Sequence, residues 1–371
     1  YKRQVNSGDS LLIGAGRKPV RLSHIYTLQG KDREETKGII AGDMGAVAKI
    51  DELHLGEVIH DDHSLDLVHH KSLAYPVPLH GLAVIPKTRG DETKIADALH
   101  RIREEDPTFS VNFDAETQEL VIHGLGELHL RLVLERLSNL GVQVEVKPPK
   151  IAYHETILAK AEGHHRHKKQ SGGAGQFGEV YLRVEPMERG GGFEFVDKVV
   201  GGVIPKQFLP AIEKGVREIM KQGIAAGYPI EDVRVTVYDG KHHSVDSKEV
   251  AFKMAGKLAF KDAFLKAKPT ILEPMVDVEV STPAEHVGSV TGDLSSRRGK
   301  VVGTDVMSSG STLVRATVPL AELNGYETSL KGMTGGRASF TMDLSHYEPA
   351  PARIVEELRA QHQGGAGNKD G

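Results

Sequence analysis

The chain is 371 residues long, carries a formal net charge of −4 at pH 7 and contains no cysteine. Disulfides and thiolate chemistry are therefore excluded, and any contact with nucleic acid has to come from local basic patches. No apolar run approaches the roughly 18 residues that a membrane span needs, so we expect a cytoplasmic protein without a membrane partner. A chain of this length is expected to form about two to four domains.

Residues 1–70 show the pattern of β structure. Short apolar runs, such as residues 10–13 and 20–22, alternate with glycine-containing turns, and no helical period is sustained. Regularly spaced short strands predict a small N-terminal β-barrel. Because Tyr1 stands in the middle of this pattern, we expect the barrel to be incomplete at its start and the chain to be a fragment that lacks an N-terminal part.

Residues 72–148 and 271–348 share one predicted order of elements, β-α-β-β-α-β. This order is typical of ferredoxin-like sandwiches. In the second segment, Thr282 is expected to cap a helix that has Pro283 at its first position and ends near Gly299. The elements expected in the first segment are a strand at 82–85, a helix at 91–105, strands at 109–113 and 119–123, a helix at 126–140 and a strand at 142–146.

Residues 150–270 form a third predicted unit, elongated and of the α+β class. A helix is expected that has Pro205 in its first turn and Gly223 directly after its last. A second one at 248–266 has Val250, Met254 and Leu258 as its predicted buried stripe. A strand at 233–238 leads into the loop 239–246. Residues 349–371 are predicted to form a C-terminal helix followed by a tail that is disordered from 364 onward.

The most informative stretch is HHRHKKQSGGAGQFG at residues 164–178. A basic, histidine-rich strand runs into a glycine-rich loop, whose glycines allow the backbone to approach a polyanion closely. Arg166, Lys168 and Lys169 supply charge that binds phosphate. The loop 239–246 again combines a lysine with paired histidines. These features predict a nucleic-acid contact at the tip of the third unit.

Other interpretations of the same stretch remain open. Residues 173–178 match G-x-G-x-x-G, although a dinucleotide site needs a strand before the motif and a helix after it. Residues 175–178 also match the GxxG clamp of KH domains. The histidines at 164, 165 and 167 could ligate zinc or titrate near phosphates. A solvated hairpin without a partner is the simplest alternative, with Asp239 and Asp246 as turn and cap residues.

Taken together, these segments resemble elongation factor G over about residues 5–348. The most specific motifs are KQSGGAGQFG at 169–178 and DGKHHSVDSKEVAFK at 239–253. The resemblance implies domains II to V of that family: the N-terminal β-barrel, two ferredoxin-like βαββαβ sandwiches, and a ribosomal-S5-like α+β domain between them. Supporting motifs are GLGELHL at 124–130, GGVIP at 201–205, GDLSSRRG at 292–299 and SHYEP at 345–349.

The resemblance also implies a set of contact residues. The tip would contact tRNA and mRNA, and Arg297 and Arg298 would contact ribosomal RNA. Ala174 stands where the family often has arginine, and the sequences at 189–192 and 201–205 look like those of elongation-factor-G-like paralogues. The tip residues carried over are Lys169, Gln170, Ser171, Gly172, Gly173, Ala174, Gly175, Gln176, His242 and His243.

The implied partner is the ribosome, with its rRNA, tRNA and mRNA, bound by a monomer of this protein. No G-x-x-x-x-G-K-[ST] occurs in the sequence, so no catalytic residue, cofactor, metal site or GTPase activity is predicted for this chain. GTP and Mg²⁺ are expected in a missing N-terminal domain of the parent protein. The alternatives are a specialised paralogue that acts in ribosome recycling or protection, a free-standing RNA-binding protein, and a metal-dependent enzyme built on the histidines.

Overall fold

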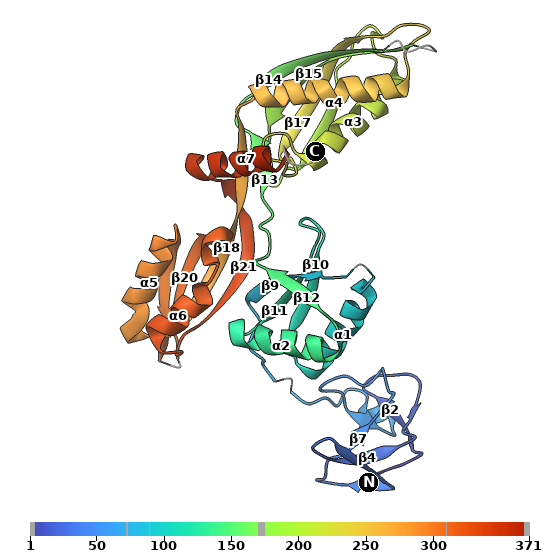
Figure 1. Ribbon diagram of the computed structural model, residues 1–371, viewed down its shortest axis with the longest axis vertical. Helices are drawn as coiled ribbons and strands as arrows, with labels where there is room; N and C mark the ends of the chain where they lie inside the picture. The colour runs from blue at the N-terminus through green and yellow to red at the C-terminus, as the bar shows by residue number, and fades with distance from the viewer. Residues whose placement is uncertain (1–3, 72, 89, 170–174, 309, 367–371) are drawn as a thin grey trace. The chain divides into compact units, whose positions relative to one another are not determined.

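The computed structural model describes residues 4–71, 73–88, 90–169, 175–308 and 310–366 (Figure 1). The chain divides into two compact units, residues 1–75 and residues 76–371. The second unit contains three sheets, each with helices packed on it. Within the described parts of the chain, no helix is both long and apolar enough to cross a membrane.

The N-terminal unit is all β, as predicted, but its described strands do not close into a barrel. They pair as three small sheets in the orders β1-β6, β3-β2-β8 and β5-β4-β7. Each strand has only two to five residues, and the described strands of one sheet form no hydrogen-bonded pairing with those of the next. The strands are β1 (Gln4–Asn6), β2 (Ser10–Ile13), β3 (Val20–Arg21), β4 (Ile25–Gln29), β5 (Asp32–Thr36), β6 (Gly38–Ile40), β7 (Ala46–Val47) and β8 (Ile59–His60).

The segment that follows has the predicted β-α-β-β-α-β order. Its two helices pack on one face of a four-stranded antiparallel sheet, and Ile95, Leu99 and Ile102 are buried as their helical spacing predicted. The sheet order is β10 (Ser110–Asp114), β11 (Glu119–Gly124), β9 (His80–Pro86) and β12 (Val144–Lys147), with helices α1 (Glu92–Glu105) and α2 (Glu127–Asn139).

The tip domain, as we call residues 149–268, is a second α+β sandwich. Helices α3 (Leu209–Gln222) and α4 (Glu249–Lys266) bury one face of its sheet, while a 3₁₀ turn (Lys206–Phe208) follows Pro205 and leads into α3. Gly223 ends α3 with a φ of 72°, a left-handed value that glycine adopts readily. The sheet order is β14 (Ala161–Lys169), β15 (Gln176–Pro186), β17 (Val233–Lys241) and β16 (Phe193–Asp197), with β16 parallel to β17.

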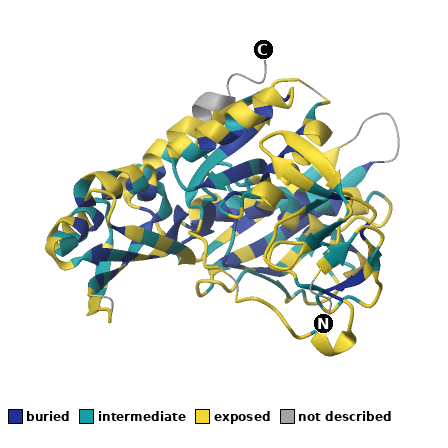
Figure 2. Ribbon diagram, turned by 90° about the horizontal axis from the view of Figure 1, so that it is seen from below, coloured by how far each residue is buried: buried dark blue, intermediate teal, exposed yellow. Residues whose placement is uncertain are grey.

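The predicted buried stripe of α4 is wrong. Val250 is 56% exposed, whereas the buried face consists of alanines and phenylalanines one or two positions further along. The reason is close packing: a Cβ on Gly163 of β14 would lie 2.2 Å from the carbonyl oxygen of Ala259. At this contact only small residues, Ala259 and Ala263 on the helix and Gly163 on the strand, allow so close an approach. Figure 2 shows buried residues along the sheets and exposed ones on the outer faces of the helices.

The C-terminal sheet repeats the β-α-β-β-α-β order, with one correction. Thr282 does not cap a helix: it is fully buried near the end of β18, and a 3₁₀ turn (Ala284–His286) precedes α5. The second predicted helix also starts as a 3₁₀ turn (Leu320–Leu323), and α6 follows it. The elements are β18 (Pro269–Pro283), α5 (Val287–Ser296), β19 (Lys300–Val306), β20 (Ser311–Pro319), α6 (Tyr326–Thr334) and β21 (Ser339–Pro349).

The tip domain and the C-terminal sheet share a strand pairing. Strand β13 (His154–Ile157) pairs with the first residues of β18, so β18 runs through the boundary predicted at 270. Glu155 of β13 is fully buried, and its carboxylate accepts hydrogen bonds from the backbone N–H groups of Ile224, Ala225, Ala226 and Tyr228.

The predicted C-terminal helix is present as α7 (Ala352–Ala366) and is longer than expected. It includes residues 364–366, where the tail was predicted to begin. The rest of that predicted tail, residues 367–371, lies outside the described residues. Val355 of α7 packs in a small core with Ala226, Ile271 and Ala350.

Two helical glycines give opposite expectations for substitution by alanine. A Cβ on Gly215 of α3 would lie 2.2 Å from the backbone oxygen of Lys253, whereas a Cβ on Gly292 of α5 would meet no described atom within 4 Å. We expect Gly215→Ala to destabilise the tip domain by about 1–3 kcal/mol. Gly292→Ala should instead stabilise its own domain by roughly 0.5–1 kcal/mol, because alanine is the better helix former.

Urea unfolding of the full chain, read out by hydrogen exchange in α3 and α5, would measure both free energies of unfolding. Equal effects of the two substitutions would contradict the close contact between α3 and α4.

Candidate nucleic-acid interface

The first tip loop joins two paired strands. Lys169 ends β14 and is paired across the hairpin with Gln176, the first residue of β15. The side-chain oxygen of Gln176 lies 3.2 Å from Nε2 of His167. Of the predicted contact residues, Gln170, Ser171, Gly172, Gly173 and Ala174 lie outside the described residues.

The second loop is hydrogen-bonded to the segment that follows the first loop. Ser247 Oγ donates to the carbonyl oxygen of Phe177 at 3.0 Å, and Phe177 N–H donates to the carbonyl oxygen of Asp246 at 2.9 Å. Gly175 leaves space for this contact, because a Cβ there would lie 2.8 Å from Oδ1 of Asp246. The two segments singled out in the sequence therefore lie side by side. The sequence alone did not single out Phe177 and Ser247, which hold them together.

The two predicted histidines of the second loop have different environments. Nδ1 of His242 lies 3.0 Å from the carbonyl oxygen of Val203, so this ring anchors the loop to the GGVIP segment. Nδ1 of His243 faces the backbone N–H groups of Val245 and Asp246 at 3.3 and 3.2 Å. Since Nδ1 accepts there, the ring proton is assigned to Nε2. The exposed His243 can thus donate a hydrogen bond to a partner.

A buried carboxylate lies in the tip hairpin, on the half of the β14–β15 ladder nearer the loop. Glu179 is 2% exposed and lies 2.8 Å from Nε2 of His164 and 3.0 Å from Nε of Arg166. Burial alone would raise the pKa of Glu179, but the hydrogen bonds from Arg166 and His164 outweigh it and lower the pKa below 4.5. No pattern in the sequence indicated this role, because the partners are set by the strand register.

The histidines of β14 do not converge on one point. His164 contacts Glu179 and His167 contacts Gln176, while burial and the nearby His167 and His164 lower the pKa of His165. Alternate residues of a strand point to opposite faces, which separates His165 from His164. Among the described residues, no group of three or more His, Asp or Glu side chains is arranged to hold a metal ion.

The two arginines after α5 are engaged within the protein. Arg298 has a φ of 61° and binds both oxygens of Glu273, at 2.7 and 2.8 Å, as well as Glu322 at 2.8 Å. Arg297 binds Asp293 at 2.8 Å and lies over the ring of Tyr326. These contacts close the loop between α5 and β19. Contact of either arginine with ribosomal RNA stays a prediction.

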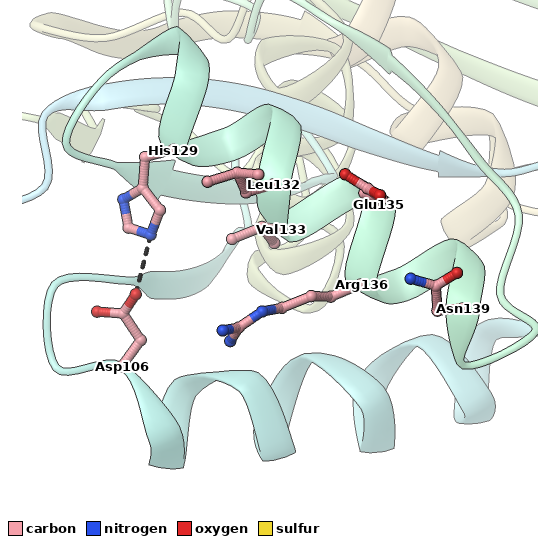
Figure 3. Close-up of a pocket in the computed structure, with 7 residues that line it drawn as sticks. All are labelled: Asp106, His129, Leu132, Val133, Glu135, Arg136 and Asn139. Atoms are coloured by element: carbon pink, nitrogen blue, oxygen red, sulfur yellow. Dashed lines mark hydrogen bonds and ion pairs between the residues drawn. The ribbon is translucent and has the colours of Figure 1, made fainter. Parts of the chain in front are cut away.

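A cleft of about 320 Å³ lies between the end of α1 and the outer side of α2 (Figure 3). Its histidine, His129, is already engaged: Nε2 lies 2.9 Å from Asp106, and Nδ1 accepts the N–H of Leu125 at 3.0 Å. The histidine of the GLGELHL motif therefore fixes the start of α2. With both ring nitrogens occupied, the residue is not available for proton transfer to a ligand.

Three family models match consecutive parts of the chain. They are described as elongation factor G domain III at residues 75–148, elongation factor G domain IV at 149–268, and elongation factor G C-terminus at 270–358. The chain belongs to the elongation factor G family. Its second unit thus consists of the domains of an elongation-factor-G-like translation factor.

A solved structure supports the same assignment. A crystallised protein from Thermus thermophilus is 39% identical to this chain and superposes with a TM-score of 0.80. The match covers 97% of this chain but 54% of that protein, so the chain spans about half the length of this relative. The agreement extends to the N-terminal unit, which none of the three family models covers.

The lowered pKa of Glu179 makes a pH-dependent prediction. Its stabilising effect is fully present above the unfolded pKa of about 4.5 and is lost as the pH falls through the folded pKa. We expect Glu179→Gln to destabilise the tip domain at pH 7. As the pH falls below about 4.5, the variant should lose less of its free energy of unfolding than the wild type does. Urea unfolding at several pH values would measure this, with the exposed Glu188→Gln as control. Parallel pH profiles for Glu179→Gln and wild type would contradict the assignment.

We expect Arg298 to stabilise the C-terminal domain, because its guanidinium is paired with carboxylates of that domain. Arg298→Ala leaves the nearly buried Glu273 carboxylate without its cation, which we expect to destabilise the C-terminal domain by about 3 kcal/mol. The matched control is Arg315→Ala, which removes ion pairs of an exposed arginine with Glu279 and Asp305 and should change stability by less than about 1 kcal/mol. Thermal unfolding of both variants would compare them.

Proposed function

We propose that this chain is the ribosome-binding part of an elongation-factor-G-like translation factor that promotes or stabilises the translocation of tRNA and mRNA. The observation that carries the proposal is the braced pair of tip loops on a domain IV fold. In this proposal the tip domain enters the decoding site, and the loop at 170–178 together with His243 lies against the codon–anticodon duplex.

The chemistry of the tip suits a partner whose sequence must not be read. The minor groove of an RNA duplex is wide and shallow and displays 2′-hydroxyls, which carry no sequence information. Glycine-rich backbone can approach such a surface, and an Nε2–H donor on His243 can bind an oxygen there. Lys169 adds a phosphate-binding charge at the end of β14.

Coupling to GTP hydrolysis is a further part of the proposal. The sequence of this chain contains no phosphate-binding G-x-x-x-x-G-K-[ST] motif, so GTP and Mg²⁺ would be held by another domain of the same protein. Hydrolysis there would change the orientation of the domains described here, and the tip would then prevent tRNA and mRNA from moving backward. We propose that the factor acts as a monomer in the cytoplasm.

A specialised role is the second candidate, favoured by particular residues. Ala174 replaces a frequent arginine of the family, and this removes a cation from the tip. The glycine-rich segment at 189–192 and the GGVIP segment resemble the paralogous subgroup. A weaker tip contact would suit a factor that acts in ribosome recycling or protection rather than in every round of elongation.

Binding to ribosomes tests the main proposal. We expect the chain to co-sediment with bacterial ribosomes, with an affinity that falls as salt is raised. The double substitution Gln170→Ala and His243→Ala should weaken binding roughly 30-fold, since two hydrogen bonds of roughly 1 kcal/mol each are lost. Lys169→Ala should weaken binding. It should also reduce by about 1 the slope of the logarithm of the binding constant against the logarithm of the salt concentration.

The control is a matched double substitution outside the tip, His100→Ala and Gln143→Ala, at two exposed positions. It should leave sedimentation unchanged. Wild-type binding by the tip variants would show that the tip does not contact the ribosome, and absence of all binding, also for the full-length protein with GTP, would refute the proposal.

A further inference from the structure

The sheet of the tip domain has a second face that α3 and α4 do not cover. Val180, Leu182 and Val184 of β15 point into the core under the helices. Side chains alternate along a strand, so Tyr181 and Arg183 point to the opposite face. The cross-strand register places His164 of β14 directly beside Tyr181 on that face.

Three aromatic rings, which we call the ring row (His164, Tyr181 and Tyr238), cross this face over β14, β15 and β17. The rings of His164 and Tyr181 are stacked, with centroids 4.0 Å apart and an angle of 21° between their planes. The ring of Tyr238 lies 6.4 Å from that of Tyr181, and the guanidinium of Arg183 lies over Tyr238 at 5.7 Å. Glu162 holds this end in place, because it binds Arg183 at 2.8 Å and accepts from the Tyr238 hydroxyl at 3.2 Å. Aromatic and cationic planes therefore follow one another across three strands.

The ring row does not belong to the hydrophobic core. The side chains of His164 and Arg183 are 42% and 46% exposed, and Tyr181 and Tyr238 are half-buried. Apolar residues on the helix side already fill the core of this domain. The three rings lie in the middle of adjacent strands on an open sheet face. They present flat surfaces on which a planar ligand can stack.

The charges around the ring row indicate which planar ligand this is. Arg166, Lys168 and Lys241 are exposed on the part of the face nearer the tip loops, and the register places Arg166 and Lys241 on either side of Glu179. Glu179 is buried and already paired with Arg166, whereas Asp239 is an exposed carboxylate beside Tyr181 in the register. Cations beside accessible rings complement a chain of phosphates that carries stacking bases.

We propose that the ring row is a binding site for single-stranded RNA. An unpaired base extends the stack of His164 on Tyr181, the neighbouring base lies against Tyr238, and the phosphates turn toward Arg166, Lys168 and Lys241. The chemistry differs from that of the tip loops, because stacking needs exposed base faces, whereas a duplex offers only its backbone and groove edges. The inference goes beyond the proposed contact with the codon–anticodon duplex and does not depend on it.

The test is direct binding of short RNA to the full chain. We expect a fluorescent single strand of about ten nucleotides to bind with a salt-dependent affinity, and a duplex of the same length to bind at least about tenfold more weakly. Tyr181→Leu removes a stacking surface and should weaken single-strand binding roughly 5- to 100-fold. Tyr181→Phe keeps the ring and should bind like the wild type. A 2-aminopurine placed in the strand should lose fluorescence on binding the wild type.

A matched control lies in the N-terminal unit. His24 stacks on Tyr26 and the guanidinium of Arg33 lies over the same ring, but this group stands beside Glu34 and Glu35. Tyr26→Leu should therefore leave RNA binding unchanged. Circular dichroism of Tyr181→Leu and of the wild type checks that any loss of binding is not caused by unfolding.

Equal binding of single strand and duplex, or equal binding by Tyr181→Leu and wild type, would overturn the inference, as would the absence of RNA binding. Ribosome co-sedimentation separates this failure from that of the proposed function. A chain that sediments through its tip but binds no single strand would retain the translation-factor proposal and lose the ring row as an RNA site.

Discussion

The buried carboxylate of Glu155 is the interaction on which the base of the tip domain depends. Four backbone N–H groups after α3 donate to it, so a turn that would otherwise leave buried donors unsatisfied becomes fixed. The same residue sits in β13, which pairs with β18 of the C-terminal sheet. One side chain therefore holds the segment after α3 against the strand that leads from one sheet to the next.

The order of elements could be predicted well from the sequence, whereas the packing of α4 could not. Periodicity correctly identified the order of strands and helices in both ferredoxin-like segments, although not the helix starts of the second one, because each element buries one face and exposes the other. In α4 the same reasoning selected Val250, Met254 and Leu258, the larger aliphatic residues. The structure instead buries alanines and phenylalanines, and the alanines lie where the helix comes closest to the sheet, since the carbonyl oxygen of Ala259 lies close to Gly163. A rule that ranks residues by hydrophobicity does not detect a contact that requires small volume.

The candidate site shows a similar limit. Glycine content and clustered cations were enough to select the two tip loops, and the structure places their described residues together through Phe177 and Ser247. Arg297 and Arg298 were selected as charged residues in a motif that the resemblance places against ribosomal RNA, and the structure shows both guanidinium groups bound to carboxylates of the same domain. Charge in a sequence gives no information about its partner. The partner of a charged side chain is decided by strand register and by long-range contacts, as for Glu179 in the tip hairpin.

The ring row adds a physical distinction to the tip domain. Its loops are suited to a folded duplex, since a glycine-rich backbone can follow a surface whose groups are the same for every sequence. Its open sheet face carries aromatic planes and cations, which suit unpaired nucleotides with exposed bases. Both surfaces share strands β14 and β15, and Glu179 holds His164 and Arg166 of the sheet face in place. A change at Glu179 would therefore act on the sheet face, whereas the loops keep their own contacts through Phe177 and Ser247.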